Sequence, residues 1–174
     1  MNTTPTHADG RREERDGIVT LVLERTFRAP ASDVWAAVTE PERLVRWIGT
    51  WSGDPASGAV MFRMTAEGED VAAEAVTIHE CDPPRRLELT IANSDEASGQ
   101  WHLELELAEA AGLTTLTFAQ RLDDPAMATD VGPGWEYYLD RLVVAQAGGD
   151  VAAVAWPDYE GMSGHYGPLF TDPS

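Results

Sequence analysis

The chain has 174 residues, of which 43% are hydrophobic and 24% are charged, and this is the composition of an ordinary globular protein. Its length suits a single domain with a sizeable core. Asp and Glu outnumber Lys and Arg by 30 to 12, so the formal net charge is -18, which disfavours nucleic acids and anionic membrane surfaces as partners.

The first 17 residues are polar and lack the apolar segment of a secretory signal peptide. Their composition predicts a disordered tail over residues 1–17. Cys81 is the single cysteine, which excludes an intrachain disulfide. No apolar run approaches the roughly 20 residues of a membrane span. These features predict a cytoplasmic protein without membrane insertion.

The first regular element is predicted at residues 18–27, where β-branched and apolar residues alternate as in a strand. Arg25 falls on the same face as the apolar residues, so it lies either at a frayed strand end or as a polar group inside a cavity. Pro30 and the polar residues after it then predict the start of a helix. Pro41 ends that helix and opens a second short one.

A run of antiparallel strands is predicted next, at residues 58–64, 71–81, 86–91, 100–109 and 113–122. In the fourth of these segments, leucines on one face alternate with His102 and glutamates on the other. This alternation is typical of a sheet with one buried face and one solvated face.

Residues 123–134 contain Gly-Pro-Gly and are predicted to be an irregular loop. A long helix is predicted from about Trp135, with one apolar stripe and a glycine pair at its end. The remaining residues, 150–174, are predicted to form an irregular tail whose aromatic residues pack on the domain. The same aromatics leave a homodimer contact open as an alternative.

Strand, two short helices, about five strands and one long helix follow one another in the chain. This order predicts an α+β fold, in which a curved antiparallel β-sheet wraps around the long C-terminal helix.

Three segments carry a family resemblance, and they are LERTFRAPASDVWAAVTEPERLVRWIG, IHECDPPRRLELTI and GPGWEYYLDRLVVAQAG. In this order they resemble the SRPBCC superfamily, also called START-like, helix-grip or birch-pollen-allergen-like. They are most similar to the branch named after the activator of the Hsp90 ATPase. The resemblance implies a single helix-grip domain over residues 18–149, between the tails 1–17 and 150–174.

The resemblance leaves three functions open, because one fold hosts many activities. The first is a binding module with an internal hydrophobic cavity for a lipid-like or aromatic small molecule. The second is an enzyme of the polyketide cyclase or aromatase type, and the third is a protein-interaction module with a chaperone partner. Many bacterial relatives carry Thr-His near the end of the last strand. This chain has Ala119 and Gln120 there, so no role of that histidine transfers.

The fold implied by the resemblance leaves a cavity between the helix and the sheet. The strand alternation and the helical stripe select the side chains that face it, and the alternative is that the same side chains fill the space as core. Arg25 and Arg63 are the candidate polar anchors of a ligand. The candidate lining is Trp47, Trp51, Phe62, Met64, Leu89, Trp101, Leu103, Phe118, Gln120, Trp135, Tyr138 and Leu142.

The histidines and the cysteine show no pattern that indicates catalysis. No Ser–His–Asp or Cys–His spacing is recognisable, and no His or Cys residues have the spacing of a metal site. We therefore expect no catalytic residues, no metal and no cofactor, and this favours binding over enzymatic activity.

Overall fold

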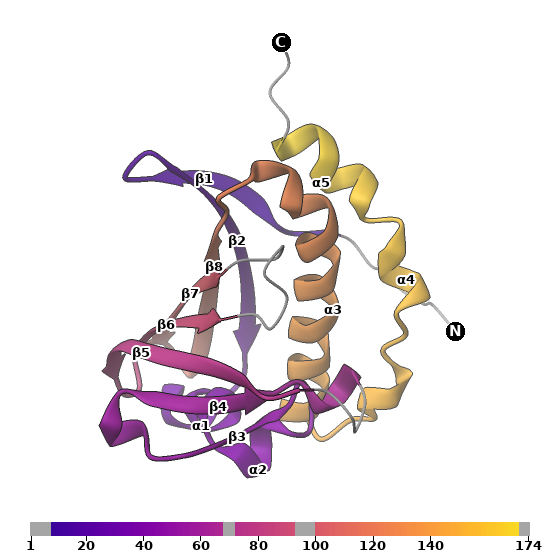
Figure 1. The fold of residues 1–174 in the computed structure, drawn as a ribbon. Helices are drawn as coiled ribbons and strands as arrows, with labels where there is room; N and C mark the ends of the chain where they lie inside the picture. Colours follow the sequence, from indigo (N-terminus) through magenta and orange to yellow (C-terminus); the bar gives the residue numbers. More distant parts are fainter. Residues whose placement is uncertain (1–7, 68–71, 93–99, 171–174) are drawn as a thin grey trace.

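The computed structural model describes residues 8–67, 72–92 and 100–170. Eight strands in this part of the chain form one curved antiparallel sheet in the order β1-β2-β8-β7-β6-β5-β4-β3 (Figure 1). The strands are β1 (Arg11–Arg15), β2 (Ile18–Phe27), β3 (Thr50–Ser52), β4 (Ala59–Arg63), β5 (Glu74–Asp82), β6 (Arg86–Ala92), β7 (Gln100–Ala110) and β8 (Leu113–Arg121).

The helices are α1 (Ala31–Thr39), α2 (Pro41–Leu44), α3 (Ala128–Gln146), α4 (Pro157–Glu160) and α5 (Ser163–Phe170). The long helix α3 lies against the concave side of the sheet, and α1 and α2 lie at the bottom of the view in Figure 1. Short 3-10 turns occur at Pro55–Ser57, Thr65–Glu67, Pro125–Met127 and Val151–Ala153. Figure 1 shows α3 between the sheet on one side and α4 and α5 on the other. None of the helices in the described part of the chain is both long enough and apolar enough to cross a membrane.

The predicted fold class is confirmed, since a curved antiparallel sheet wraps around the long helix α3. The alternation along β7 explains this packing. Leu103, Leu105 and Leu107 are buried in the core with Leu139 of α3, whereas Glu106 between them is exposed. Period-2 alternation therefore directs one face of the strand toward the helix.

The prediction of disorder over residues 1–17 is wrong for its second half. Residues 11–15 form β1, which pairs with β2 at one edge of the sheet. β1 has the sequence RREER, and a charged strand of this kind escapes detection by hydrophobic periodicity. Its side chains instead make ion pairs, such as that of Arg11 with Glu24 on β2. Residues 1–7 lie outside the described part of the chain.

The predicted loop at residues 123–134 is also partly wrong, because α3 begins at Ala128 and includes Gly132 and Pro133. The ring of Tyr166 packs so closely on Gly132 that a Cβ atom at this position would lie 2.6 Å from it. Glycine and proline normally indicate a break in a helix. Here the packing of α5 against α3 favours the helix over the local signal.

Helices occupy much of the C-terminal segment that was predicted to be irregular. α5 packs on α3 and buries Tyr166 and Phe170, which are 0% and 2% exposed. The described part of the segment therefore packs on α3 in a largely helical conformation. These two aromatic side chains are buried within one chain, so they are not available for a contact between two chains. A homodimer stays a prediction, but Tyr166 and Phe170 do not support it.

Candidate functional site

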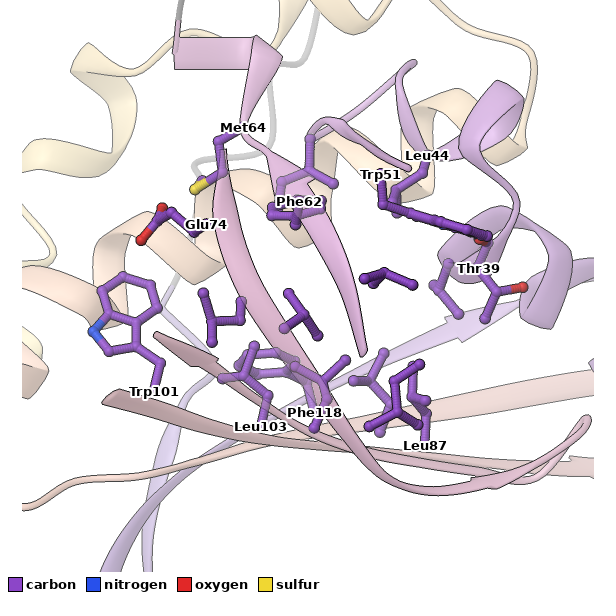
Figure 2. A pocket seen from close by; sticks show the side chains of 18 of the residues that line it. Thr39, Leu44, Trp51, Phe62, Met64, Glu74, Leu87, Trp101, Leu103 and Phe118 are labelled. Atoms are coloured by element: carbon purple, nitrogen blue, oxygen red, sulfur yellow. The ribbon is translucent and has the colours of Figure 1, made fainter. Parts of the chain in front are cut away.

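A cavity of about 270 Å³ lies between the sheet, the α1–α2 segment and α3. Figure 2 shows Trp101, Met64 and Glu74 at one end of this pocket and Trp51 and Thr39 at the opposite end (Figure 2). The pocket reaches the surface, because two of its lining residues, Pro55 and Cys81, are exposed.

The structure places nine of the twelve predicted lining residues on the pocket. They are Trp47, Trp51, Phe62, Met64, Leu89, Trp101, Leu103, Phe118 and Trp135. Strand alternation selects them correctly where the pleat is regular, as at Phe62, which faces the pocket while its neighbour Met61 is 43% exposed. That these nine residues bind a ligand stays a prediction.

Three of the predicted lining residues are buried elsewhere. Tyr138 packs its ring edge-on against Trp135, with the ring centroids 6.3 Å apart, and Leu142 lines a separate small cavity together with Trp47. Gln120 is 1% exposed and accepts a hydrogen bond from Trp135 Nε1 at 2.6 Å. Gln120 therefore positions a pocket tryptophan instead of contacting the pocket itself.

Neither predicted polar anchor reaches the pocket. Arg63 is exposed. Arg25 is buried outside the pocket, where Nη2 lies 3.1 Å from Glu136 Oε2 and Nε lies 2.9 Å from Asp140 Oδ1. Burial alone would lower the pKa of Arg25, but the charges of Asp140 and Glu136 outweigh it and raise that pKa. The frayed-end interpretation of Arg25 is therefore wrong, and so is its assignment as a ligand anchor.

The sequence did not single out the remaining lining residues, which are mostly aliphatic. They are Val38, Thr39, Leu44, Ile48, Pro55, Val60, Glu74, Val76, Ile78, Cys81, Leu87, Ile91, Leu105, Leu116 and Leu139. Strand parity indicates many of them, since Val76 and Ile78 are two residues apart on β5. The lining residues of the α1–α2 segment have no such signal in the sequence. The tertiary fold decides which part of the sheet this segment covers.

The indole N–H groups of three pocket tryptophans are already satisfied within the protein. The acceptors are Ala37 O for Trp47 at 2.9 Å, Thr39 O for Trp51 at 2.7 Å and Gln120 Oε1 for Trp135 at 2.6 Å. Trp101 Nε1 is buried and has no hydrogen-bond partner among the described residues. Trp47, Trp51 and Trp135 thus offer a ligand their ring surfaces instead of hydrogen-bond donors.

Polar groups on the pocket lining are few. The Thr39 hydroxyl donates to Trp35 O at 2.6 Å, so it is engaged within α1. Burial, aided by the negative charge of Asp82, raises the pKa of the Cys81 thiol, which is therefore protonated at neutral pH. Glu74 is the one charged side chain among the described lining residues.

A second group of polar side chains lies on the neighbouring strands β6 and β7, outside the pocket lining. One ligand atom each from Glu88, His102 and Glu104 lies within 4.8 Å of the others, a grouping that the sequence did not indicate. Arg86 contacts both carboxylates, with Nη2 at 3.2 Å from Glu88 and 3.6 Å from Glu104. Burial alone would raise the pKa of Glu88, but its bonds with Arg86 and His102 lower it. Because arginine already neutralises these carboxylates, the arrangement favours an ion-pair network over a cation site.

Comparison with known proteins supports the same fold. CalU16 from Micromonospora echinospora superposes with a TM-score of 0.74 at 24% identity, covering 97% of this chain and 100% of that one. A conserved protein of unknown function from Enterococcus faecalis, EF2215, superposes with a TM-score of 0.70 at 16% identity over 94% of this chain and 92% of that one. DynU16, from the dynemicin biosynthetic locus, superposes with a TM-score of 0.54 at 20% identity over 71% of this chain and 45% of that one.

At these identities the superpositions show a shared fold alone. No curated protein sequence matches the chain. The family model described as "Activator of Hsp90 ATPase homolog 1-like protein" matches residues 28–146, which is more than half of the chain. The chain therefore belongs to the activator of Hsp90 ATPase homolog 1-like family, within the SRPBCC superfamily of helix-grip proteins.

Proposed function

We propose that the chain is a binding module that holds an apolar small molecule in the pocket between its sheet and α3. The observation that carries this proposal is a cavity of about 270 Å³ whose described lining is almost wholly aliphatic and aromatic. Small-molecule sites are typically concave and apolar, with few polar groups. Water in such a cavity finds few polar groups to bond with. An apolar ligand therefore takes its place favourably.

The size of the cavity indicates the size of the ligand. An apolar cavity of about 150 Å³ accommodates one benzene molecule. The cavity here has nearly twice that volume, about 270 Å³, which suits a body of two fused rings or a branched chain of similar volume. Larger ligands would extend through the exposed mouth at Pro55 and Cys81.

The expected affinity follows from the apolar area that such a ligand would bury. A two-ring body burying about 200 Å² gains about 5 kcal/mol at about 25 cal/mol per Å². This free energy corresponds to a Kd of about 0.2 mM before other costs of association are counted. Fragment-sized probes must therefore be tested at millimolar concentrations, and a natural ligand of higher affinity would have to contact the mouth as well.

The lining residues support binding more than catalysis. Acid–base catalysis needs a titratable group within hydrogen-bond reach of the substrate, with a partner to complete the proton transfer. Among the described lining residues, the Cys81 thiol is protonated and the Thr39 hydroxyl is engaged within α1, so neither of them forms an acid–base pair with a carboxylate of the lining. The polyketide cyclase alternative therefore finds no acid–base pair on the described part of the lining.

Calorimetric titration with 1-naphthalenemethanol, a neutral two-ring alcohol, tests the proposal. We expect saturable binding at one site and a slower reaction of the Cys81 thiol with a disulfide reagent when the probe is bound. The matched control is Val76→Phe, because Val76 is 5% exposed and lines the pocket. In an open cavity the added ring fills empty space, so the variant should fold with similar stability and lose the probe.

Absence of probe binding, together with a loss of about 1–3 kcal/mol of stability in Val76→Phe, would show that side chains already fill this space. The binding proposal would then be wrong. Native mass spectrometry of the purified protein adds an independent readout, since a retained adduct identifies the ligand class directly.

The family description favours a second candidate, stimulation of a chaperone ATPase. This function needs an exposed surface for a protein partner and does not depend on the pocket. Measuring the ATPase rate of purified Hsp90 with and without the chain tests it. An increase that persists in Val76→Phe would assign the activity to the surface of the domain.

A further inference from the structure

Trp101 forms the wall of the pocket at the end opposite Trp51, as Figure 2 shows. The residue is half-buried, so it lines the cavity and also reaches the surface. Its ring meets that of Trp135 edge to face, with the ring centroids 6.1 Å apart. Within the described ranges no hydrogen bond adds to this contact, because Nε1 of Trp101 is buried without a partner.

The other three tryptophans of the pocket are each fixed by a hydrogen bond. Nε1 of Trp47, Trp51 and Trp135 donates to an oxygen of the protein, at distances between 2.6 and 2.9 Å. Turning any of these rings out of the pocket would break that bond, whereas turning Trp101 would break none. The pocket therefore has three fixed indole walls and one that packing alone holds in place.

The unpaired N–H group raises the free energy of the inward position of Trp101. A buried donor that has lost water and gained no acceptor costs about as much as a broken hydrogen bond. Gln120 Nε2 is also buried without a partner in the described part of the chain, but two donors cannot satisfy each other. Gln120 Oε1 already accepts from Trp135, which fixes the orientation of the amide. Turning Trp101 outward would give its N–H water as an acceptor.

The place of Trp101 in the sheet leaves room for such a rotation. It is the second residue of β7 and pairs with Ile91 near the end of β6. On its other side, the ladder with β8 ends at Arg121, which pairs with His102, so Trp101 lies one residue beyond that ladder. A change of side-chain rotamer at this corner of the sheet therefore breaks no backbone hydrogen bond between β7 and β8.

We propose that Trp101 is the gate of the pocket, whose ring turns outward to admit a ligand and returns against Trp135 to close the cavity behind it. This inference rests on the proposed function, because a gate needs a ligand to admit. It makes Trp101 a determinant of the rates of binding and release, as side chains and loops that close a site often are. Entry through the exposed mouth at Pro55 and Cys81 is the competing route, and it would not depend on Trp101.

The motion of the gate is measured first without any ligand, by fluorine NMR of the full chain labelled with 5-fluorotryptophan. Trp101→Phe and Trp51→Phe assign the two resonances. We expect exchange broadening and relaxation dispersion for Trp101, on the microsecond-to-millisecond scale of such rearrangements, and a sharp resonance for the hydrogen-bonded Trp51. A Trp101 resonance as sharp as that of Trp51 would overturn the gate.

The rates of binding provide the second readout. NMR line shapes during titration with 1-naphthalenemethanol give the association and dissociation rate constants, and saturable binding shows that each variant is folded. In Trp101→Phe, whose smaller ring closes the pocket less completely, we expect both rate constants to rise about threefold to tenfold while Kd changes by less than about threefold. Trp51→Phe is the matched control, because it makes the same substitution at the opposite end of the pocket and should not speed association.

An unchanged association rate in Trp101→Phe, or an equal rise in both variants, would overturn the gate and assign entry to the mouth at Pro55 and Cys81. Binding of the probe by a protein whose Trp101 resonance is sharp would also overturn the gate, but would leave the binding module in place. Failure of the wild type to bind the probe would overturn the binding module and the gate with it.

Discussion

Removing the guanidinium of Arg25 should destabilise the domain strongly. The side chain of Arg25 is 8% exposed and that of Glu136 is 0% exposed, so Arg25→Met leaves a carboxylate buried without its cation. Breaking a buried ion pair from one side typically costs about 3–5 kcal/mol. Three donors still reach Glu136 Oε1, namely the Tyr166 hydroxyl at 2.7 Å and the N–H groups of Asp9 and Gly10 at 2.8 and 2.9 Å. We therefore expect a loss near the lower end, about 3 kcal/mol.

Urea denaturation monitored by tryptophan fluorescence measures this loss, and for a domain of this size a loss of about 3 kcal/mol lowers Tm by about 6–12 °C. Arg11→Met is the matched control. Arg11 pairs with Glu13 and Glu24 on the same edge of the sheet, but its side chain is 46% exposed, and such pairs contribute about 0–1 kcal/mol. Equal losses in the two variants would refute the reasoning, because burial would then make no difference to the free energy of the pair.

Two further predictions concern α3 and the tyrosine that packs on it. Gly132→Ala should lower the free energy of unfolding by about 1–3 kcal/mol, since its Cβ would lie 2.6 Å from the Tyr166 ring. Gly134→Ala is the control, because its Cβ meets nothing within 4 Å, and it should raise the free energy of unfolding by up to about 1 kcal/mol. Thermal unfolding measures both changes, and a shift of Tm in the same direction in the two variants would contradict the reasoning. Burial, with the charge of Glu136, raises the pKa of Tyr166 above its ordinary value of 10.0. The folded state then holds this proton more tightly than the unfolded state, so the contribution to stability is complete below about pH 10 and is lost as the pH rises further. The free energy of unfolding should fall less steeply above pH 10 in Tyr166→Phe than in the wild type, and parallel pH profiles would refute the assignment.

The sequence predicts the pocket best where the strands are regular. Trp101 and Leu103 on β7 share the face that the alternation assigns to the core, and both line the cavity. β5 shows where this reasoning ends. Its register shifts between Ile78 and Glu80, so that Cys81 lines the pocket although alternation from Ile78 would select Glu80. A β-bulge inserts one residue and reverses the parity beyond it, and nothing in the local composition indicates it here.

Long-range polar contacts are the other feature that the sequence did not predict. Glu136 lies in a helical segment whose alternating polar and apolar residues suggest an ordinary surface glutamate. Its partners Gly10 and Arg25 are 126 and 111 residues away along the chain, so no local pattern brings them together. Periodicity identifies which face of a helix is apolar, but it does not show when a charge within that face is paired.

The partners of Glu136 also bear on where the domain ends. The family match covers residues 28–146 and includes Glu136, but Gly10, Arg25 and Tyr166 all lie outside it. On α3, Glu136 follows directly after Trp135, which lines the pocket, and the same holds for Asp140 and Leu139. The two α3 residues that line the pocket, Trp135 and Leu139, are thus each followed by a carboxylate that bonds to Arg25, outside the family match. A fragment confined to the family match would lack both the groups that bond to the Glu136 carboxylate and part of the structure that buries it. The segments that contain β1, β2 and α5 therefore belong to the folded unit, and they fix the orientation of the helix that forms one wall of the pocket.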